Sequence, residues 1–285
     1  MILIADGGST KCDWALIQGN KVQKTQTLGL NSTVVSQSEI KNRIAANKIL
    51  MEAAPEISHI EFFGAGCGSA RSRLSMSDIL GEFFPNAKIE VVEDTVGAVK
   101  AVTDQEAIVC ILGTGSNSCY FDGKNIEQPI ASLGYVIMDE AGASHFGKML
   151  IRDYYYNRMP VEIRGEFEKG FNLNREEILF KLYKEPSPGV YLASFSTFIF
   201  KDNLHQLYHP YFKELINNAL ELFVQNRILT FPQSREVPIH FVGSIAHFSK
   251  DSIGEILEKH QLKLGKIVRY PIDELIRKYQ KPQVS

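Results

Sequence analysis

The hydrophobic and polar positions of the chain follow one strand–turn–strand pattern twice. Near the start, the apolar run at residues 2–5 leads into a turn of glycine, serine and threonine, and a second apolar run follows. The same order recurs from residue 108, where another apolar run leads into a second glycine and hydroxyl turn. Short apolar runs bounded by glycine turns are typical of β-strands. The repeat therefore predicts an α/β protein built from two related domains.

The remaining periodicity fills in both halves. In the first half, alternating and helical spacings predict strands at 2–6, 12–17, 22–28, 57–63 and 89–93, and helices at 36–54, 75–84 and 96–102. In the second half they predict strands at 108–112, 119–121 and 239–242, and helices at 141–158, 175–183, 192–207, 211–229, 252–264 and 271–279. We place the domain boundary near residue 106, which gives domains of 1–106 and 107–285. The last helix is a candidate to pack back on the first domain.

Composition and charge exclude several classes of protein. The 285 residues are 44% hydrophobic, and 31 basic side chains face 33 acidic ones for a net charge of -2. A nucleic-acid surface needs concentrated Lys and Arg, so we expect no nucleic-acid partner. No apolar run approaches the ~20 residues of a membrane span. Because a strand begins at once and no basic, apolar leader precedes it, we expect a cytoplasmic protein with no membrane partner.

The four cysteines carry no recognisable cofactor pattern. Cys12, Cys67, Cys110 and Cys119 show neither a CxxC pair nor metal-binding Cys and His spacing. We interpret them as buried, reduced thiols.

The first glycine turn is a candidate phosphate loop. It comprises Gly7, Gly8, Ser9, Thr10 and Lys11 and directly follows Asp6. Glycines let the main chain approach a phosphate, successive N–H groups form an anion cradle, and the hydroxyls add donors. Asp6 at the strand end can hold Mg²⁺ through water. The alternative is a plain hairpin turn, with Lys11 solvated.

The second glycine turn comprises Gly113, Thr114, Gly115 and Ser116. Alone it has the same alternative, a plain hairpin turn. Its recurrence in register with the first turn favours phosphate binding for both. Two such turns facing each other across a cleft can hold the phosphates of one nucleotide.

Two further candidate positions lie where strands end, and a third precedes a long helix. Asp94 follows the predicted strand at 89–93 and opens a helix, a place where open α/β sheets bind ligands. It is a candidate general base toward a hydroxyl, and the alternative is a helix N-cap. Gly243 and Ser244 follow a strand and can accommodate a flat base or ribose, unless they are an ordinary strand-to-helix junction. The pair Asp139 and Glu140 says little by itself.

In this order, the two glycine turns, Asp94, the pair Asp139-Glu140 and Gly243-Ser244 resemble the sugar kinase–Hsp70–actin superfamily. Within it, the chain resembles the N-acetylglucosamine kinase branch, which also includes the BadF/BadG/BcrA/BcrD ATPases. The resemblance runs from Ile2 to about Tyr279. It implies two ribonuclease H-like, actin-type ATPase domains with a nucleotide cleft between them.

The resemblance also implies roles for single residues. It matches residues 7–10 and 113–116 to the two phosphate loops, Asp6 to the metal-side acid and Asp94 to the catalytic base, which also contacts the sugar. It matches Gly243 and Ser244 to the adenosine motif. Asn31 and Asp139 match sugar-binding positions. The family stretch G-D-E-G-S reads Met138-Asp139-Glu140-Ala141-Gly142 in this chain, which alters the pocket wall.

The implied activity is phosphoryl transfer from ATP, with Mg²⁺, to the C6 hydroxyl of an amino sugar such as N-acetylglucosamine. A homodimer is a further expectation of the resemblance. Three alternatives stay open: an ATPase that activates a partner through a shared iron–sulfur cluster, a sugar-sensing repressor, and a catalytically weak sugar- and nucleotide-binding relative. The repressor would need a helix-turn-helix ahead of the first strand, where the sequence has none.

Overall fold

The computed structural model describes residues 1–200 and 209–280, and the chain divides into two compact units. Unit 1 holds Met1–Asp104 together with the chain from Tyr270, and unit 2 holds Gln105–Arg269. Helix α14 (Pro271–Gln280) therefore belongs to unit 1, although it follows the whole of unit 2 in sequence. Among the described residues, no helix combines the length and the apolar character needed to cross a membrane.

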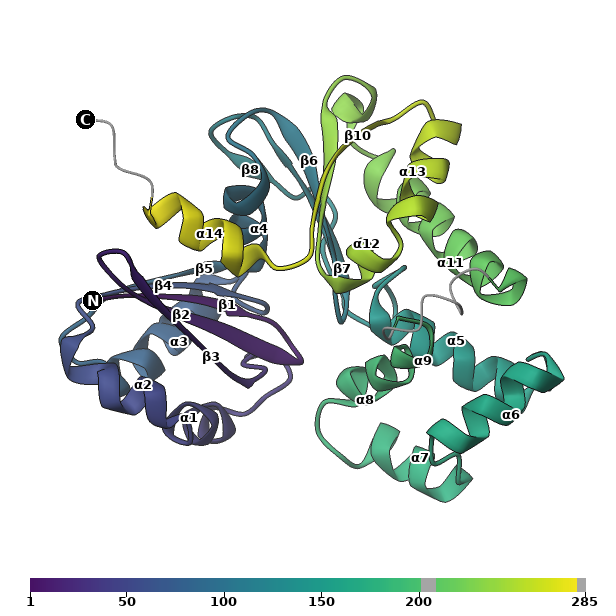
Figure 1. Ribbon diagram of the computed structural model, residues 1–285, viewed down its shortest axis with the longest axis horizontal. Helices are drawn as coiled ribbons and strands as arrows, with labels where there is room; N and C mark the ends of the chain where they lie inside the picture. The colour runs from purple at the N-terminus through teal and green to yellow at the C-terminus, as the bar shows by residue number, and fades with distance from the viewer. Residues whose placement is uncertain (201–208, 281–285) are drawn as a thin grey trace. The chain divides into compact units, whose positions relative to one another are not determined.

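Unit 1 is built on a five-stranded sheet in the order β3-β2-β1-β4-β5. Strands β1, β4 and β5 are parallel, and β2 and β3 form an antiparallel meander with β1. Helices α1–α3 cover one face of this sheet, and α4 and α14 lie together on the other (Figure 1). The strands are β1 (Ile2–Gly7), β2 (Lys11–Gln18), β3 (Lys21–Leu28), β4 (His59–Gly64) and β5 (Lys88–Glu93). The helices are α1 (Gln37–Ala45), α2 (Lys48–Ala53), η1 (Ala54–Glu56), α3 (Ala70–Phe83) and α4 (Asp94–Val102).

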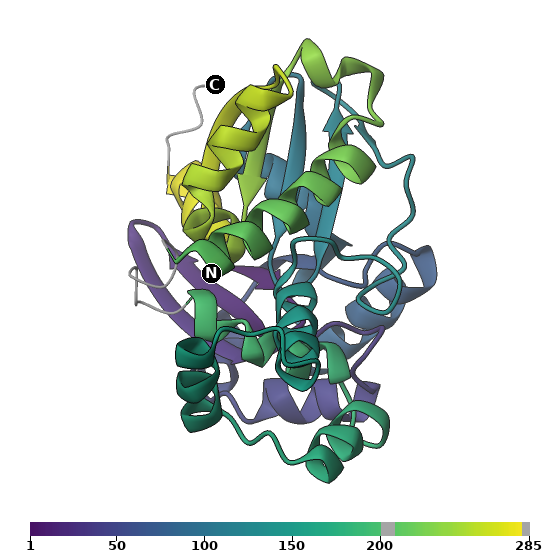
Figure 2. The same ribbon diagram turned by 90° about the vertical axis from the view of Figure 1, so that its right-hand side faces the viewer.

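Unit 2 repeats the same sheet with a large helical insertion. Its strand order β10-β9-β6-β7-β8 matches the first sheet strand for strand, with β6, β9 and β10 parallel. Helices α5–α9 lie beyond one end of this sheet (Figures 1 and 2). The strands are β6 (Ala107–Leu112), β7 (Ser116–Phe121), β8 (Ile126–Glu127), β9 (Pro238–Val242) and β10 (Lys263–Val268). The helices are α5 (Ala143–Tyr155), α6 (Val161–Gly170), α7 (Arg175–Tyr183), α8 (Pro188–Phe195), α9 (Thr197–Phe200), α11 (Pro210–Phe223), η2 (Val224–Ile228), η3 (Pro232–Arg235), α12 (Ser244–Phe248) and α13 (Lys250–Lys259).

Each unit has its own apolar core. Trp14 and Phe62 pack at the centre of unit 1, with ring centroids 6.0 Å apart. Unit 2 has a larger core rich in phenylalanine, with Phe146, Phe167 and Phe223 fully buried. Burying such aromatic area stabilises each unit, and in unit 2 the inserted helices contribute to the core.

Most predicted elements are present, and three predictions are wrong in detail. The single helix expected at 36–54 is two helices, because Asn47 breaks the first and caps the second through its side chain. Helix α3 begins at Ala70, five residues before the expected start, because Ser69 and Ser72 form a capping box there. The helix expected through residue 264 ends at Lys259, and the chain turns into edge strand β10. Residues 201–207 of the helix expected at 192–207 lie outside the described residues.

Candidate functional site

Loop 1 (residues 7–11) joins β1 to β2, and its carbonyl groups point into the protein. Gly8 O accepts from Leu30 N–H at 3.2 Å, and Thr10 O accepts from Gly29 N–H at 3.0 Å. In a trans peptide the N–H lies opposite the C=O of the same unit. The N–H groups that follow these two carbonyls therefore point away from residues 29–30. This orientation would let the loop present main-chain donors to an anion, and its role in phosphate binding stays a prediction.

Asn31 ties loop 1 to the turn that follows β3. Its Nδ2 donates to Ser9 Oγ at 2.8 Å, and its Oδ1 accepts from Thr33 N–H at 3.0 Å and from Thr33 Oγ1 at 2.7 Å. The structure therefore brings Asn31 to loop 1, with both ends of its amide engaged within unit 1. Its sugar-binding role stays a prediction.

Three parallel strands bring the predicted carboxylates of unit 1 to one edge of the sheet. Gly7 of β1 pairs with Gly64 of β4, which pairs with Glu93 of β5, so the strands end level with one another. Asp6 and Asp94 lie at the first and last of these strand ends. This is the edge where open α/β sheets bind ligands.

The electrostatics of this edge favour a cation. Burial, followed by the charges of Asp13 and Asp94, raises the pKa of Asp6 to about 7, and Lys11 only partly offsets this. Ionised carboxylates this close repel one another, and oxygen donors of this kind are the ligands that Mg²⁺ prefers. A cation at this edge would relieve that repulsion, and metal binding at Asp6 stays a prediction.

Asp94 is the first residue of α4 and is half-buried. The N-cap position belongs to Glu93, whose backbone is extended and whose side chain makes no capping bond. The alternative interpretation of Asp94 as an N-cap is therefore wrong. The role of Asp94 as general base stays a prediction.

Lys11 is directed to neighbours within unit 1. Its Nζ lies 2.7 Å from Asp13 Oδ2 and 5.2 Å from the centroid of the Tyr270 ring. The side chain is 45% exposed, so this ion pair is weak. Phosphate binding by Lys11 stays a prediction.

The loop after β4, residues 64–69, is arranged by a residue that the sequence analysis did not select. Arg73 in α3 donates to Gly68 O at 2.7 Å and to Cys67 O at 3.2 Å. Burial raises the pKa of the Cys67 thiol to about 12, and Asp94 adds to the effect. The loop is therefore held beside Asp94 by an arginine, and its cysteine is an inert thiol.

Loop 2 (residues 113–116) joins β6 to β7 and is held by the first turn of α5. Ala143 N–H donates to Gly113 O at 2.9 Å, and Ser144 N–H donates to Thr114 O at 2.9 Å. The N–H groups that follow these carbonyls point away from α5 by the same peptide geometry. Loop 2 therefore repeats the outward-facing donors of loop 1, on a different support.

Asp139 braces loop 2 from the other side. Its Oδ1 accepts the Ser116 N–H at 3.2 Å, and the residue is 8% exposed. A Cβ added at Gly115 would lie 2.5 Å from Asp139 Oδ2, so a side chain at that position cannot fit without a shift. The structure therefore joins Asp139 to a phosphate-loop candidate, and its predicted sugar contact stays a prediction.

Gly243 and Ser244 follow β9 beside loop 2. Gly243 has φ +116°, and a Cβ there would collide with Leu112 O, directly before loop 2. Its N–H donates to Val268 O at 2.9 Å, which fixes the turn against β10. Ser244 is exposed at the start of α12. The predicted adenosine motif and loop 2 therefore lie together in unit 2.

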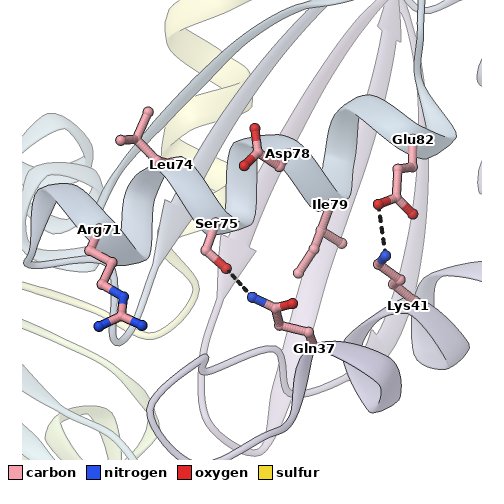
Figure 3. A pocket seen from close by; sticks show the side chains of 8 residues that line it. All are labelled: Gln37, Lys41, Arg71, Leu74, Ser75, Asp78, Ile79 and Glu82. Atoms are coloured by element: carbon pink, nitrogen blue, oxygen red, sulfur yellow. Dashed lines mark hydrogen bonds and ion pairs between the residues drawn. The ribbon is translucent and has the colours of Figure 1, made fainter.

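A groove of about 480 Å³ lies between α1 and α3, away from every predicted site residue. Figure 3 shows two polar pairs bonded across the seam, Lys41 with Glu82 at 2.7 Å and Gln37 donating to Ser75 at 2.9 Å. We interpret it as a packing seam between two helices.

The four cysteines are all buried and free. Burial raises the pKa of Cys12 and of Cys110 above the ordinary thiol range. This confirms the prediction of buried reduced thiols, and it removes the exposed cysteines that a cluster shared between subunits would need.

No protein-family model and no curated protein sequence matches the chain. Among solved structures, a Porphyromonas gingivalis protein provisionally named an N-acetylglucosamine kinase has a TM-score of 0.89 and 32% identity, with 100% of both chains covered. This chain belongs to the N-acetylglucosamine kinase family. The resemblance and fold class predicted from the sequence are thereby confirmed.

Two more distant structures agree with the family fold. A Chromobacterium violaceum protein, also provisionally named an N-acetylglucosamine kinase, is 13% identical with a TM-score of 0.68, over 93% of this chain and 94% of that one. A ROK family glucokinase from Streptomyces griseus, in complex with glucose and AMPPNP, is 12% identical with a TM-score of 0.52, over 94% and 93% of the two chains. At these identities the likeness concerns the fold alone.

Proposed function

We propose that the protein is an ATP-dependent sugar kinase that phosphorylates the C6 hydroxyl of an amino sugar, with N-acetylglucosamine as the first candidate. The observation that carries the proposal is the level ending of β1, β4 and β5, which gathers Asp6, Asp94 and loop 1 at one edge. Membership of the N-acetylglucosamine kinase family supports the same substrate class.

In the proposed reaction Asp94 accepts the proton of the sugar hydroxyl as that oxygen attacks the γ-phosphorus of ATP, and the bond from this phosphorus to the β–γ bridging oxygen breaks to release ADP. Loops 1 and 2 donate main-chain N–H groups to the phosphates. Asp6 would hold Mg²⁺ through water, and the ion, when bound, neutralises charge on the phosphate oxygens. The protein's part is mainly positioning and electrostatic stabilisation, because phosphoryl transfer needs little covalent help from side chains.

The roles of the other predicted residues follow from their places. We assign Gly243 and Ser244 to the adenosine, since they adjoin loop 2. We assign Asn31 and Asp139 to the sugar, and each also supports a glycine loop through its own hydrogen bonds. A change at either residue should therefore affect both substrates.

A catalytically weak relative is the second candidate, and one observation favours it. In the altered stretch Met138-Asp139-Glu140-Ala141-Gly142, both Asp139 (φ 69°) and Ala141 (φ 57°) adopt the left-handed conformation that glycine favours. An alanine at such a position strains the turn that carries Asp139.

The test is ADP release with Mg·ATP against a panel of amino sugars and plain hexoses, beside a control without sugar. We expect turnover with one or two amino sugars and little without sugar. ADP release that ignores sugar would favour a partner-coupled ATPase. Nucleotide binding without turnover would favour the weak relative.

A further inference from the structure

Arg227 is a buried cation with unusually weak acceptors. It is 1% exposed and lies in η2, the π-helical turn that continues α11. Its guanidinium contacts Ile130 O at 3.4 Å and Met138 Sδ at 3.3 Å, and it forms no ion pair within 4.0 Å with any residue that the structure describes. Burying a charge without a close counterion is costly, so its retention points to a specific task.

The contacts of Arg227 join three parts of unit 2. Its side chain reaches both ends of the segment 130–138, which leads directly into Asp139. Its main-chain carbonyl accepts from Ser118 Oγ at 3.0 Å, on β7, the strand that leaves loop 2. One residue thus links η2, β7 and the segment that carries Asp139.

The charge of Arg227 also acts on Asp139. Burial raises the pKa of this carboxyl, and the Ser116 N–H and then Arg227 oppose the rise. Two other charged groups face it, Glu140, which raises its pKa, and Lys148, which lowers it. The ionised Asp139 carboxylate is a stronger acceptor for the Ser116 N–H than the protonated acid would be.

We propose that Arg227 is the positioning residue for loop 2, because it holds segment 130–138 at both ends and keeps the Asp139 carboxylate against the Ser116 N–H. The proposal deepens the proposed function, since it makes Arg227 a determinant of nucleotide affinity without contact with the nucleotide. Single turns of π-helix inside α-helices occur often at functional sites, which agrees with the irregular turn that presents this side chain.

The test uses two variants. Arg227→Met keeps much of the side-chain volume and removes the charge, and Arg227→Lys keeps the charge and removes the planar guanidinium group. Exposed Arg235 in η3 supplies the matched control, Arg235→Met. Amide hydrogen exchange at Ser116 is followed in each ligand-free protein from pH 5 to 8, and affinity for an ATP analogue is measured by calorimetry.

We expect Arg227→Met to speed exchange at Ser116 about tenfold and to weaken nucleotide binding by a similar factor, the size of coupling between neighbouring sites. Protonation of Asp139 at low pH should weaken the protection of the Ser116 N–H from exchange. In Arg227→Met this weakening should begin at a higher pH, because Asp139 then protonates more readily. Arg227→Lys should keep the wild-type pH profile with a smaller increase in exchange. In an Asp139→Asn background, either change at Arg227 should add little.

The proposal is overturned if Ser116 exchange in folded Arg227→Met equals that of the control. Equal acceleration throughout β9 would also overturn it, since that is the sign of a general loss of stability. If Arg227→Met does not fold, non-additivity between Arg227→Lys and Asp139→Asn decides the question. A wild-type protein that binds no nucleotide would refute the proposed function, and the exchange result at Ser116 would still stand.

Discussion

The two units share one sheet design and differ in the chemistry at matching strand ends. In unit 1, Asp6 precedes loop 1 and Asp94 follows β5; at the matching places in unit 2 stand Leu112 before loop 2 and Arg269 after β10. Both units have a glycine loop whose main-chain N–H groups face outward. Among these four matching positions, the two carboxylates both lie in unit 1. Under the proposed function, this difference would leave the acid–base work to unit 1 and phosphate binding to both loops.

The supports of the two loops differ in the same way. Loop 1 is held by the main chain of residues 29–30 and by the neutral side chain of Asn31. Loop 2 is held by the first turn of α5 and by the Asp139 side chain, on which the charge of buried Arg227 acts from a distance. Loop 2 should therefore be the more sensitive to pH.

The prediction with the largest expected effect tests the assignment of acid–base work to unit 1. Asp94→Ala removes the proposed base, so turnover should fall about 10²–10⁴-fold while affinity for ATP stays near wild type. Steady-state rates and calorimetry measure the two quantities. Asp104→Asn, at an exposed ion pair of unit 1, is the matched control. Wild-type turnover in Asp94→Ala would show that the base is another group.

The next effect tests whether unit 2 contributes binding. Gly115→Ala places a methyl group against Asp139 Oδ2 and should displace loop 2, weakening ATP binding about 10²-fold, as expected for a shift near 1 Å. Gly165→Ala in α6 is the control, because a Cβ there meets nothing within 4 Å. Unchanged nucleotide affinity in Gly115→Ala would remove loop 2 from the site.

The two units should also respond to acid in opposite directions. The pKa of Asp6 is raised to about 7, so its contribution to stability grows as pH falls through 7 toward 3.8. Burial, with Lys148 adding, lowers the pKa of His145 to about 4, so its contribution is complete above 6.5 and is lost as pH falls toward 4.

Thermal or urea unfolding of the metal-free protein between pH 4 and 6.5 separates these effects. Asp6→Asn should leave the free energy of unfolding rising with pH, and His145→Gln should leave it falling, each by up to about 1.4 kcal/mol per pH unit. Parallel profiles for the two variants would contradict the assignment of opposite roles.

The prediction with the smallest expected effect tests whether the altered stretch at residues 138–142 is strained. Ala141→Gly relieves a left-handed alanine but removes a buried methyl group and frees the unfolded chain. We expect a gain in the free energy of unfolding of no more than about 1 kcal/mol, with sugar affinity equal or better. A loss of stability greater than that, measured by urea unfolding, would show that the turn is not strained.

The periodic signals explain why the fold could be predicted and where prediction failed. The apolar runs at residues 2–5 and 108–112 form the central strands, because both faces of these strands are buried. Strand β10 was not predicted, and its first two residues were assigned to the end of a helix, since it is an edge strand with a register shift between Leu264 and Ile267. His240 causes part of that irregularity, for its Nδ1 accepts the Lys266 N–H at 2.7 Å.

The site shows the same division between local and distant signals. Asp6, Asp94 and both loops could be selected because each lies at a strand end. Arg227 could have been found, since it interrupts the apolar stripe of Phe223, Val224 and Ile228 in a predicted helix. The hydrogen bond from Ser116 N–H to Asp139 could not have been predicted, because it joins residues 23 apart in sequence.

The measurement that most directly tests the central claim is a ³¹P NMR spectrum of wild-type protein after incubation with Mg·ATP and N-acetylglucosamine. We predict a new sugar phosphate resonance that is coupled to the protons on carbon 6, forms in step with ADP and is absent in Asp94→Ala. A spectrum with ADP and inorganic phosphate but no sugar phosphate from any amino sugar would contradict it.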